Sequence, residues 1–193
     1  MATHDVGVLV FGGRPAPRIL RALPTIALDQ VTDFRRVIVL GGNADVAAVL
    51  KQLLRADRLD VEVAHLRRRW RARRALTGAA SRVPLIRDET GSVIVGAAVW
   101  TGADAPLVGE AVVDDTVLFD GEVSAVRVEP TVAAPGLRAA VLSARMRPGR
   151  WVTGRAAQLG TPGAVVTRDG QPGPRTVKRS TFYRHTQGWL AVR

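Results

Sequence analysis

The sequence predicts an α+β protein with a short N-terminal α/β lobe of βαβαβ pattern and a C-terminal, sandwich-like antiparallel β lobe. In the first third, short β-branched runs alternate with segments that carry apolar residues at helical spacing. From Val83 onward, short alternating segments recur with Gly and Pro between them, as is typical of antiparallel sheets. Small residues around position 80 resemble a linker, so we expect lobes at 1–80 and 81–193.

The most informative segment of the first lobe, Arg35–Leu54, predicts a strand, a glycine turn and a helix. Val37–Leu40 is β-branched and apolar, as expected for a strand covered on both faces. After Gly41-Gly42, apolar residues recur at helical spacing. Such a turn can hold a phosphate, because free N–H groups and the helix dipole point towards it. It can equally be an ordinary tight connection, and the sequence leaves both interpretations open.

The segments on either side complete the first lobe. Val6–Phe11 predicts a first strand, and Asp60–Leu66 alternates as a third strand. Between the first two strands, Ile19–Leu23 shows a short helical face that Pro24 stops, and Thr25–Phe34 is a linker with some helical character. We expect the three strands to form a parallel sheet with helices packed against it.

The sharpest charge feature follows the third strand, in the sequence RRRWRARR. Its six arginines are Arg67, Arg68, Arg69, Arg71, Arg73 and Arg74, and they account for more than half of the formal net charge of +11. One interpretation is a solvated helix or connector. The other is a clamp for phosphate, a lipid headgroup or nucleic acid.

In the second lobe, three acidic turns punctuate the strands. They are Asp88–Gly91, Asp114-Asp115 and Asp169-Gly170. The strands expected around and after them are 83–86, 93–100, 110–113, 116–119, 122–129, 137–144, 151–159, 164–167, 175–183 and 189–192.

Composition excludes several classes of function. The chain has no Cys, so disulfides, thiol catalysis and Cys-based metal sites are excluded. No apolar run approaches the length of a membrane-spanning helix, and the N-terminus lacks the basic region of a signal peptide. We therefore expect a cytoplasmic protein whose only membrane contact is peripheral. The basic charge predicts anionic partners.

Motifs for catalysis are few. The three histidines share no ligand spacing, and no P-loop, nucleophile elbow or H-E-x-x-H occurs, so no metal ligands are assigned. Asp120-Gly121-Glu122 remains. It predicts either a hairpin turn with an exposed carboxylate or a functional acid, with Glu122 as general base or metal-organising group.

The C-terminal stretch Gly154–Arg193 contains a Gly-Arg-Ala-Ala-Gln strand, an Asp-Gly turn, a Lys-Arg-Ser-Thr-Phe strand and a final Trp-Leu-Ala-Val-Arg. This stretch, the Asp-Gly-Glu strand in Phe119–Pro130 and the order of the lobes resemble the diacylglycerol kinase and NAD kinase-like superfamily, particularly actinobacterial lipid kinase homologues. The resemblance implies that fold, ATP and Mg²⁺ as cofactors, and phosphorylation of a lipid hydroxyl with Glu122 as the catalytic base.

The resemblance also shows where this chain departs from the pattern. Where the superfamily carries a Gly-Gly-Asp-Gly-Thr loop for the nucleotide, Gly41 and Gly42 match, but Asn43, Ala44 and Asp45 stand in the next three places. Asn lacks the charge that organises Mg²⁺, and Ala44 adds a Cβ where the backbone is expected to approach phosphate, in a conformation that favours glycine. The second loop, Gly-Thr-Gly-Asn, has no match. We expect a reduced member with weak or absent catalysis, and the sequence leaves open whether Asp45 replaces the missing aspartate.

Two alternatives come from other classes of function. The basic charge suits a nucleic-acid-binding protein, although the expected platform of aromatic and basic residues interleaved on one strand is absent, and Lys178–Arg184 is the nearest approach to it. An incomplete α/β lobe with open sheet edges suits a homodimeric interaction module. The expected partners are thus an anionic small molecule or lipid headgroup at a peripheral membrane, with nucleic acid or a second copy as alternatives.

Overall fold

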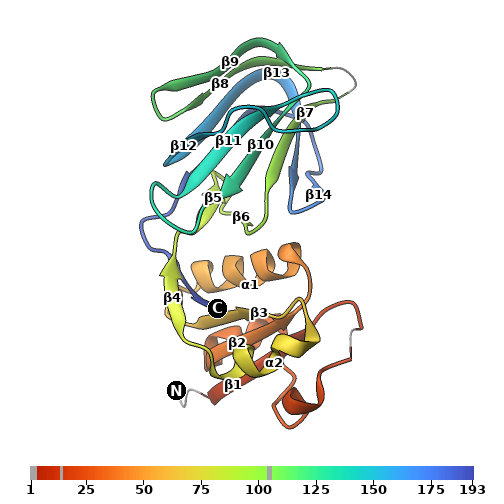
Figure 1. Cartoon of the computed structure of the whole chain (residues 1–193), viewed down its shortest axis with the longest axis vertical. Coiled ribbons are helices and arrows are strands. Elements are labelled where there is room, and N and C mark those ends of the chain that lie inside the picture. Colours follow the sequence, from red (N-terminus) through yellow and green to blue (C-terminus); the bar gives the residue numbers. More distant parts are fainter. Residues whose placement is uncertain (1–3, 14, 104–105) are drawn as a thin grey trace. The chain divides into compact units, whose positions relative to one another are not determined.

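A computed structural model describes residues 4–13, 15–103 and 106–193 (Figure 1). These residues form two compact units. The first contains the chain up to Val83 together with Gln187–Arg193, and the second contains Pro84–Thr186. The α+β class is confirmed: the first unit has a mixed sheet with helices, and the second has a large antiparallel sheet.

The first unit is built on a five-stranded sheet in the order β1-β2-β3-β16-β4. β1, β2, β3 and β16 run parallel, whereas β4 is antiparallel to β16. Its elements are β1 (His4–Val10), the 3₁₀ turns η1 (Arg18–Leu20) and η2 (Leu28–Asp33), β2 (Phe34–Leu40), α1 (Asn43–Arg55), β3 (Glu62–His65), the 3₁₀ turn η3 (Arg69–Arg71), α2 (Ala72–Thr77), β4 (Ala80–Val83) and β16 (Trp189–Val192).

The predicted strand–turn–helix is β2, Gly41-Gly42 and α1. Val37, Ile38 and Val39 are completely buried, because helical elements cover both faces of the sheet. α1 buries Val46, Val49, Leu50 and Leu53 on one face, while η1 and α2 pack against the other face through Leu20, Ala72 and Ala75 (Figure 1). The first crossover contains only 3₁₀ turns, so the helix of the βαβαβ pattern there is absent; prolines at 15, 17 and 24 limit regular helix.

The C-terminal strand lies in the first unit. β16 is parallel to β3 and antiparallel to β4, so it fills the place between them. The two units divide between Val83 and Pro84 and again between Thr186 and Gln187. The expected division into 1–80 and 81–193 differs from this arrangement. The strand itself was expected, but its partner sheet depends on residues more than a hundred positions earlier, which local patterns do not reveal.

The second unit is an antiparallel sheet of eleven strands with the main order β12-β11-β10-β7-β13-β15-β5-β6, in which β13 also pairs with β8 and β14 and β8 pairs with β9. The strands are β5 (Ile86–Asp88), β6 (Val93–Ile94), β7 (Ala98–Gly102), β8 (Leu107–Val113), β9 (Thr116–Val123), β10 (Ala125–Pro130), β11 (Leu137–Leu142), β12 (Val152–Gly154), β13 (Ala156–Arg168), β14 (Gln171–Pro172) and β15 (Val177–Arg184).

The long strand β13 organises this sheet. The sequence suggested two strands, 151–159 and 164–167, but residues 156–168 form one strand. Its first part pairs with β8 and its second part with β7, and the register shifts between Gly160 and Ala164. The Gly-Thr-Pro-Gly segment, which resembles a turn, is therefore an irregularity within a continuous strand.

A buried aromatic pair and a buried ion pair fix the core of the second unit. Trp100 and Phe182 are fully buried and stack with ring centroids 5.9 Å apart, and the Trp100 indole N–H donates to Ser180 Oγ at 3.0 Å. Asp88 is completely buried, and its Oδ2 accepts from Arg168 at 2.6 Å while Oδ1 accepts from three donors of its own turn. Both oxygens of this carboxylate therefore accept hydrogen bonds, and these bonds offset the free-energy cost of burying its charge.

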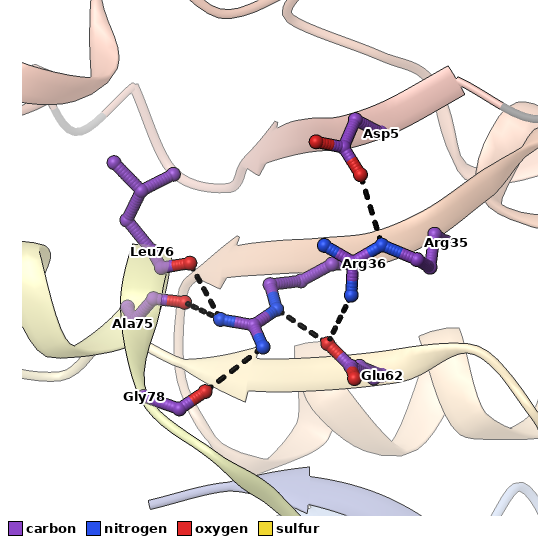
Figure 2. A network of polar contacts seen from close by, with 7 residues as sticks. All are labelled: Asp5, Arg35, Arg36, Glu62, Ala75, Leu76 and Gly78. Carbon is purple, nitrogen blue, oxygen red and sulfur yellow. Dashed lines mark hydrogen bonds and ion pairs between the residues drawn. The ribbon is translucent and has the colours of Figure 1, made fainter.

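One buried arginine joins three elements of the first unit (Figure 2). Arg36, on β2, is only 5% exposed. Its Nε donates to Glu62 Oε2 on β3 at 2.6 Å, and its two terminal nitrogens donate to the carbonyls of Ala75, Leu76 and Gly78 at 3.2, 2.5 and 2.8 Å. These carbonyls lie at the C-terminal end of α2, where a helix leaves acceptors unpaired. Arg36 thereby caps α2 and holds it to the sheet.

Neighbouring Arg35 provides a matched comparison for Arg36. It also reaches Glu62, at 3.0 Å, but its side chain is half exposed. We expect Arg36→Ala to lower the unfolding free energy of the first unit by about 3 kcal/mol, because it leaves buried carbonyls and a carboxylate unpaired. Arg35→Ala is expected to cost less than about 1 kcal/mol. Urea unfolding followed by circular dichroism at the helical band measures both, and equal losses would contradict this role of Arg36.

In the second unit, Glu129 links β10 to β11. Its carboxylate accepts from Arg127 at 2.6 Å and from Arg138 at 2.7 and 3.0 Å. Burial alone would raise its pKa, but the hydrogen bonds from Arg127 and Arg138 outweigh this, and the pKa of Glu129 lies below its usual range. A lowered pKa means that the ionised form stabilises the fold above the ordinary pKa, and that this contribution disappears as pH falls through the folded value.

We therefore expect Glu129→Gln to destabilise the second unit by about 1 kcal/mol at neutral pH. The difference from the parent protein shrinks as the pH falls below about 4, since the parent then also loses its carboxylate charge. Denaturant titrations at several pH values measure this, with the exposed Glu110→Gln as the control. A difference that does not change with pH would show that the charge of Glu129 is not the cause.

Candidate functional site

The carboxyl ends of β1, β2 and β3 lie at one edge of the first unit's sheet, because these strands are parallel neighbours. The segments that leave this edge are Gly12-Gly13 after β1, Gly41-Gly42 after β2 and the arginine-rich segment after β3. In α/β proteins this edge is where ligands usually bind. All predicted site residues except Glu122 belong to these segments or to the helices that follow them.

The glycine turn is closed by a side chain of its own helix. Gly42 precedes α1, whose first residue is Asn43, and Asp45 Oδ2 accepts the Gly42 N–H at 2.7 Å. The same carboxylate lies against Gly41, where a Cβ would collide with it. Ala44 lies in the first turn of α1 and does not have the positive φ that the resemblance suggested. Asp45 therefore occupies one of the N–H donors that a phosphate could use at this turn.

A cationic hollow lies next to this turn. His65, at the end of β3, places its Nε2 3.1 Å from the Gly41 carbonyl oxygen. Together with Arg67, Arg68 and Arg71, His65 lines a cavity of about 550 Å³. The turn and the arginine-rich segment thus meet at His65.

The six arginines predicted as anion ligands are all exposed, and none forms an ion pair with a carboxylate in the described ranges. Several arginines elsewhere differ: Arg35, Arg36, Arg58, Arg127, Arg138 and Arg168 all pair with Asp or Glu. The segment forms η3 and the start of α2, so it is helical only in part. Its positive charge is not neutralised by any carboxylate among the described residues and is available to an anion.

An apolar cavity shares Arg67 with this hollow. Its volume is about 250 Å³, and its lining residues are Pro15, Pro17, Leu40, Leu66, Arg67 and Arg69. A ligand with an anionic group and an apolar part would place the anionic group in the cationic hollow and the apolar part in this cavity.

Glu122 lies in the second unit, within β9. The hairpin-turn interpretation of Asp120-Gly121-Glu122 was wrong: these residues pair with Glu110, Gly109 and Val108 of β8, and the turn is at Asp114-Asp115. Alternation along the strands places Glu110, Asp120 and Glu122 on one outward face, opposite buried Phe119. In the part of the chain that the structure describes, the Glu122 side chain has no hydrogen-bond or ion-pair partner.

The donor set does not suit a nucleotide triphosphate with a metal ion. Within residues 4–13, 15–103 and 106–193, no group of three His, Asp or Glu side chains is placed to hold a metal. At the glycine turn, the Asp45 carboxylate would repel a phosphate at close range. Neutral Asn43 begins the helix where the resemblance implies an aspartate.

Sequence reasoning missed His65 and the closure by Asp45. A carboxylate three residues after the residue that precedes a helix is a known capping signal, so the Gly42–Asp45 contact was open to prediction. The contact of His65 with Gly41 depends on the parallel pairing of β2 and β3, and no local pattern reveals it.

Removal of the Asp45 carboxylate tests whether it closes the turn. We expect Asp45→Ala to destabilise the first unit by about 1 kcal/mol, because an N-terminal helix donor loses its acceptor. We also expect inorganic phosphate to recover more stability in this variant than in the parent, since the Gly42 N–H becomes free. Thermal unfolding with and without phosphate measures both effects. Equal recovery in the two proteins would contradict the idea that Asp45 excludes anions from the turn.

No protein-family model matches the chain, and no curated protein sequence matches it. Solved structures do. A putative diacylglycerol kinase from Bacillus anthracis is 11% identical, with a TM-score of 0.73 over 100% of this chain and 98% of that one. A second diacylglycerol kinase structure from the same organism, also 11% identical, gives 0.70 over the same shares.

An NAD kinase from Archaeoglobus fulgidus, in complex with ATP, is 12% identical, with a TM-score of 0.64 over 98% of this chain and 93% of that one. Because these similarities extend over nearly the whole of each chain, they concern both units. The resemblance stated from the sequence is confirmed at the level of architecture: this chain has the fold of the diacylglycerol kinase and NAD kinase-like proteins.

Proposed function

We propose that the chain is a diacylglycerol kinase-like protein that binds a phosphate-bearing anion and transfers phosphate weakly or not at all. The observation that carries this proposal is the placement of the Asp45 carboxylate on the Gly42 N–H, directly beside a cationic hollow. A glycine turn capped by Asp45, next to arginines that form no ion pair among the described residues, favours binding through the arginines and disfavours the arrangement that phosphoryl transfer requires.

The case for anion binding comes from charge and position. Arg67, Arg68 and Arg71 enter one cavity at the carboxyl edge of a parallel sheet. Guanidinium groups recognise phosphate through paired N–H donors, and these three form no ion pair with a carboxylate in the part of the chain that the structure describes. The structurally similar NAD kinase was solved with ATP, which supports nucleotides among the phosphate compounds worth testing.

The case for weak or absent catalysis comes from three residues. Phosphoryl transfer depends on metal ions and cationic groups that neutralise the phosphates, and on a carboxylate that positions the acceptor hydroxyl. At the glycine turn, Asn43 is neutral and Asp45 carries a negative charge, so neither residue helps to neutralise the phosphates. Glu122 is the residue that the resemblance implies for the second, and it is an exposed strand residue with no partner among those described.

A thermal-shift experiment tests the binding proposal. The ligands are inorganic phosphate, ADP, ATP and NAD, each with and without Mg²⁺. We expect phosphate compounds to raise the melting temperature without a requirement for Mg²⁺, by a few degrees when the ligand is in large excess over its Kd. In the variant Arg67→Ser/Arg68→Ser/Arg71→Ser this shift is lost. The matched control, Arg145→Ser/Arg147→Ser/Arg150→Ser, removes three exposed arginines of the second unit and keeps the shift.

A kinase assay tests the proposal that the chain transfers phosphate weakly or not at all. ADP release is followed with Mg-ATP and diacylglycerol vesicles, for the parent and for Glu122→Gln. We expect both to show the same background rate. A Mg²⁺-dependent thermal shift together with turnover that Glu122→Gln abolishes would contradict the loss of catalysis. Absence of any phosphate-induced shift would contradict the anion site.

A further inference from the structure

An exposed tryptophan lies within the arginine-rich segment. Trp70 is 70% exposed, whereas Trp100 is fully buried and Trp151 and Trp189 are partly buried. Its ring has one polar neighbour of note, the Arg71 guanidinium, which lies 4.8 Å from the ring centroid. No core element holds Trp70 in place, so packing within the unit does not explain this large apolar side chain.

Other apolar groups lie on elements that contact the same segment. Ile19 of η1 is 48% exposed, and η1 packs against α2, which begins within the arginine-rich segment. The apolar cavity is lined by Pro15 and Pro17, just before η1, and by Arg67 and Arg69. The surface therefore combines exposed apolar side chains, a small apolar cavity and six arginines that form no ion pair with any described carboxylate. We call it the Trp70 surface, defined by Ile19, Trp70 and the arginines at 67, 68, 69, 71, 73 and 74.

We propose that the Trp70 surface docks the first unit onto a membrane that contains anionic phospholipid. The arginines bind the lipid phosphates, and Trp70 enters the interfacial region, where an indole places its ring among acyl chains and its N–H among polar headgroups. The His65, Arg67, Arg68 and Arg71 hollow accepts one headgroup, so this inference rests on the anion site proposed above and specifies its ligand.

A membrane fits these observations better than a nucleic acid does. Single-stranded nucleic acid is bound by several aromatic side chains that stack on successive bases, and the Trp70 surface has one. An apolar cavity and an exposed isoleucine add nothing to the recognition of phosphodiesters. They do contribute at a bilayer surface, where binding combines buried apolar area with attraction to anionic lipid.

Vesicle flotation of the full chain tests the inference. Vesicles of phosphatidylcholine alone are compared with vesicles containing about one-third phosphatidylglycerol, which supply the anionic charge. We expect binding only to the anionic vesicles. Trp70→Ala is expected to weaken it about tenfold, and Arg67→Ser/Arg68→Ser/Arg71→Ser to abolish it. Arg145→Ser/Arg147→Ser/Arg150→Ser binds like the parent. Because Trp70 is exposed, its replacement leaves the melting temperature unchanged.

Fluorescence gives a second, local readout. Anionic vesicles are expected to shift the tryptophan emission of the parent to shorter wavelength, and Trp70→Phe removes that shift. If phosphate still stabilises the protein but anionic vesicles do not bind, the membrane inference is overturned and the anion site stands. If neither phosphate nor vesicles have an effect, both are overturned. Binding of single-stranded DNA that depends on Trp70, without vesicle binding, also overturns the membrane inference.

Discussion

The buried guanidinium of Arg36 is the interaction on which the first unit's candidate site depends. It reaches Glu62 at the start of β3 and three carbonyls at the end of α2 (Figure 2). The arginine-rich segment lies between these two points of attachment. A stretch with so much like charge repels itself and favours an extended, disordered chain. Both ends of the segment are fixed because Arg36, which is buried and paired with Glu62, holds them to the sheet.

Arginines in this protein thus serve two physical purposes. Arg36, Arg138 and Arg168 each pair with a carboxylate on another strand, and Arg36 also caps a helix. The arginines of the Trp70 surface form no ion pair with any carboxylate among the described residues. The sequence gives no sign of this division, because the two kinds occur in similar runs. For Arg36, Arg138 and Arg168 the partner carboxylate lies on a different strand, so their role depends on how the sheet is assembled.

Sequence patterns predicted best where one element determines its own structure. β2, the glycine turn and α1 follow from a β-branched run and a helical repeat, and the acidic turns of the second unit follow from local turn chemistry. Prediction failed where distant pairing decides: the sheet that receives β16, the continuity of β13 through Gly160, and the place of Glu122 within β9. For the candidate site, the sequence revealed the arginine-rich segment. It did not reveal that His65, just before this segment, contacts the carbonyl of Gly41.

The return of β16 to the first unit has a consequence for synthesis. β4 has one partner in its sheet, β16, and their contact between Arg82 and Gly188 spans 106 residues. All strands of the second unit are made in this interval. As the chain is synthesised, the sheet of the first unit can be completed only after all strands of the second unit have been made, because β16 follows them in the sequence. Until then β3 has no strand on its β16 side, and an exposed strand edge of this kind is open to pairing with another chain.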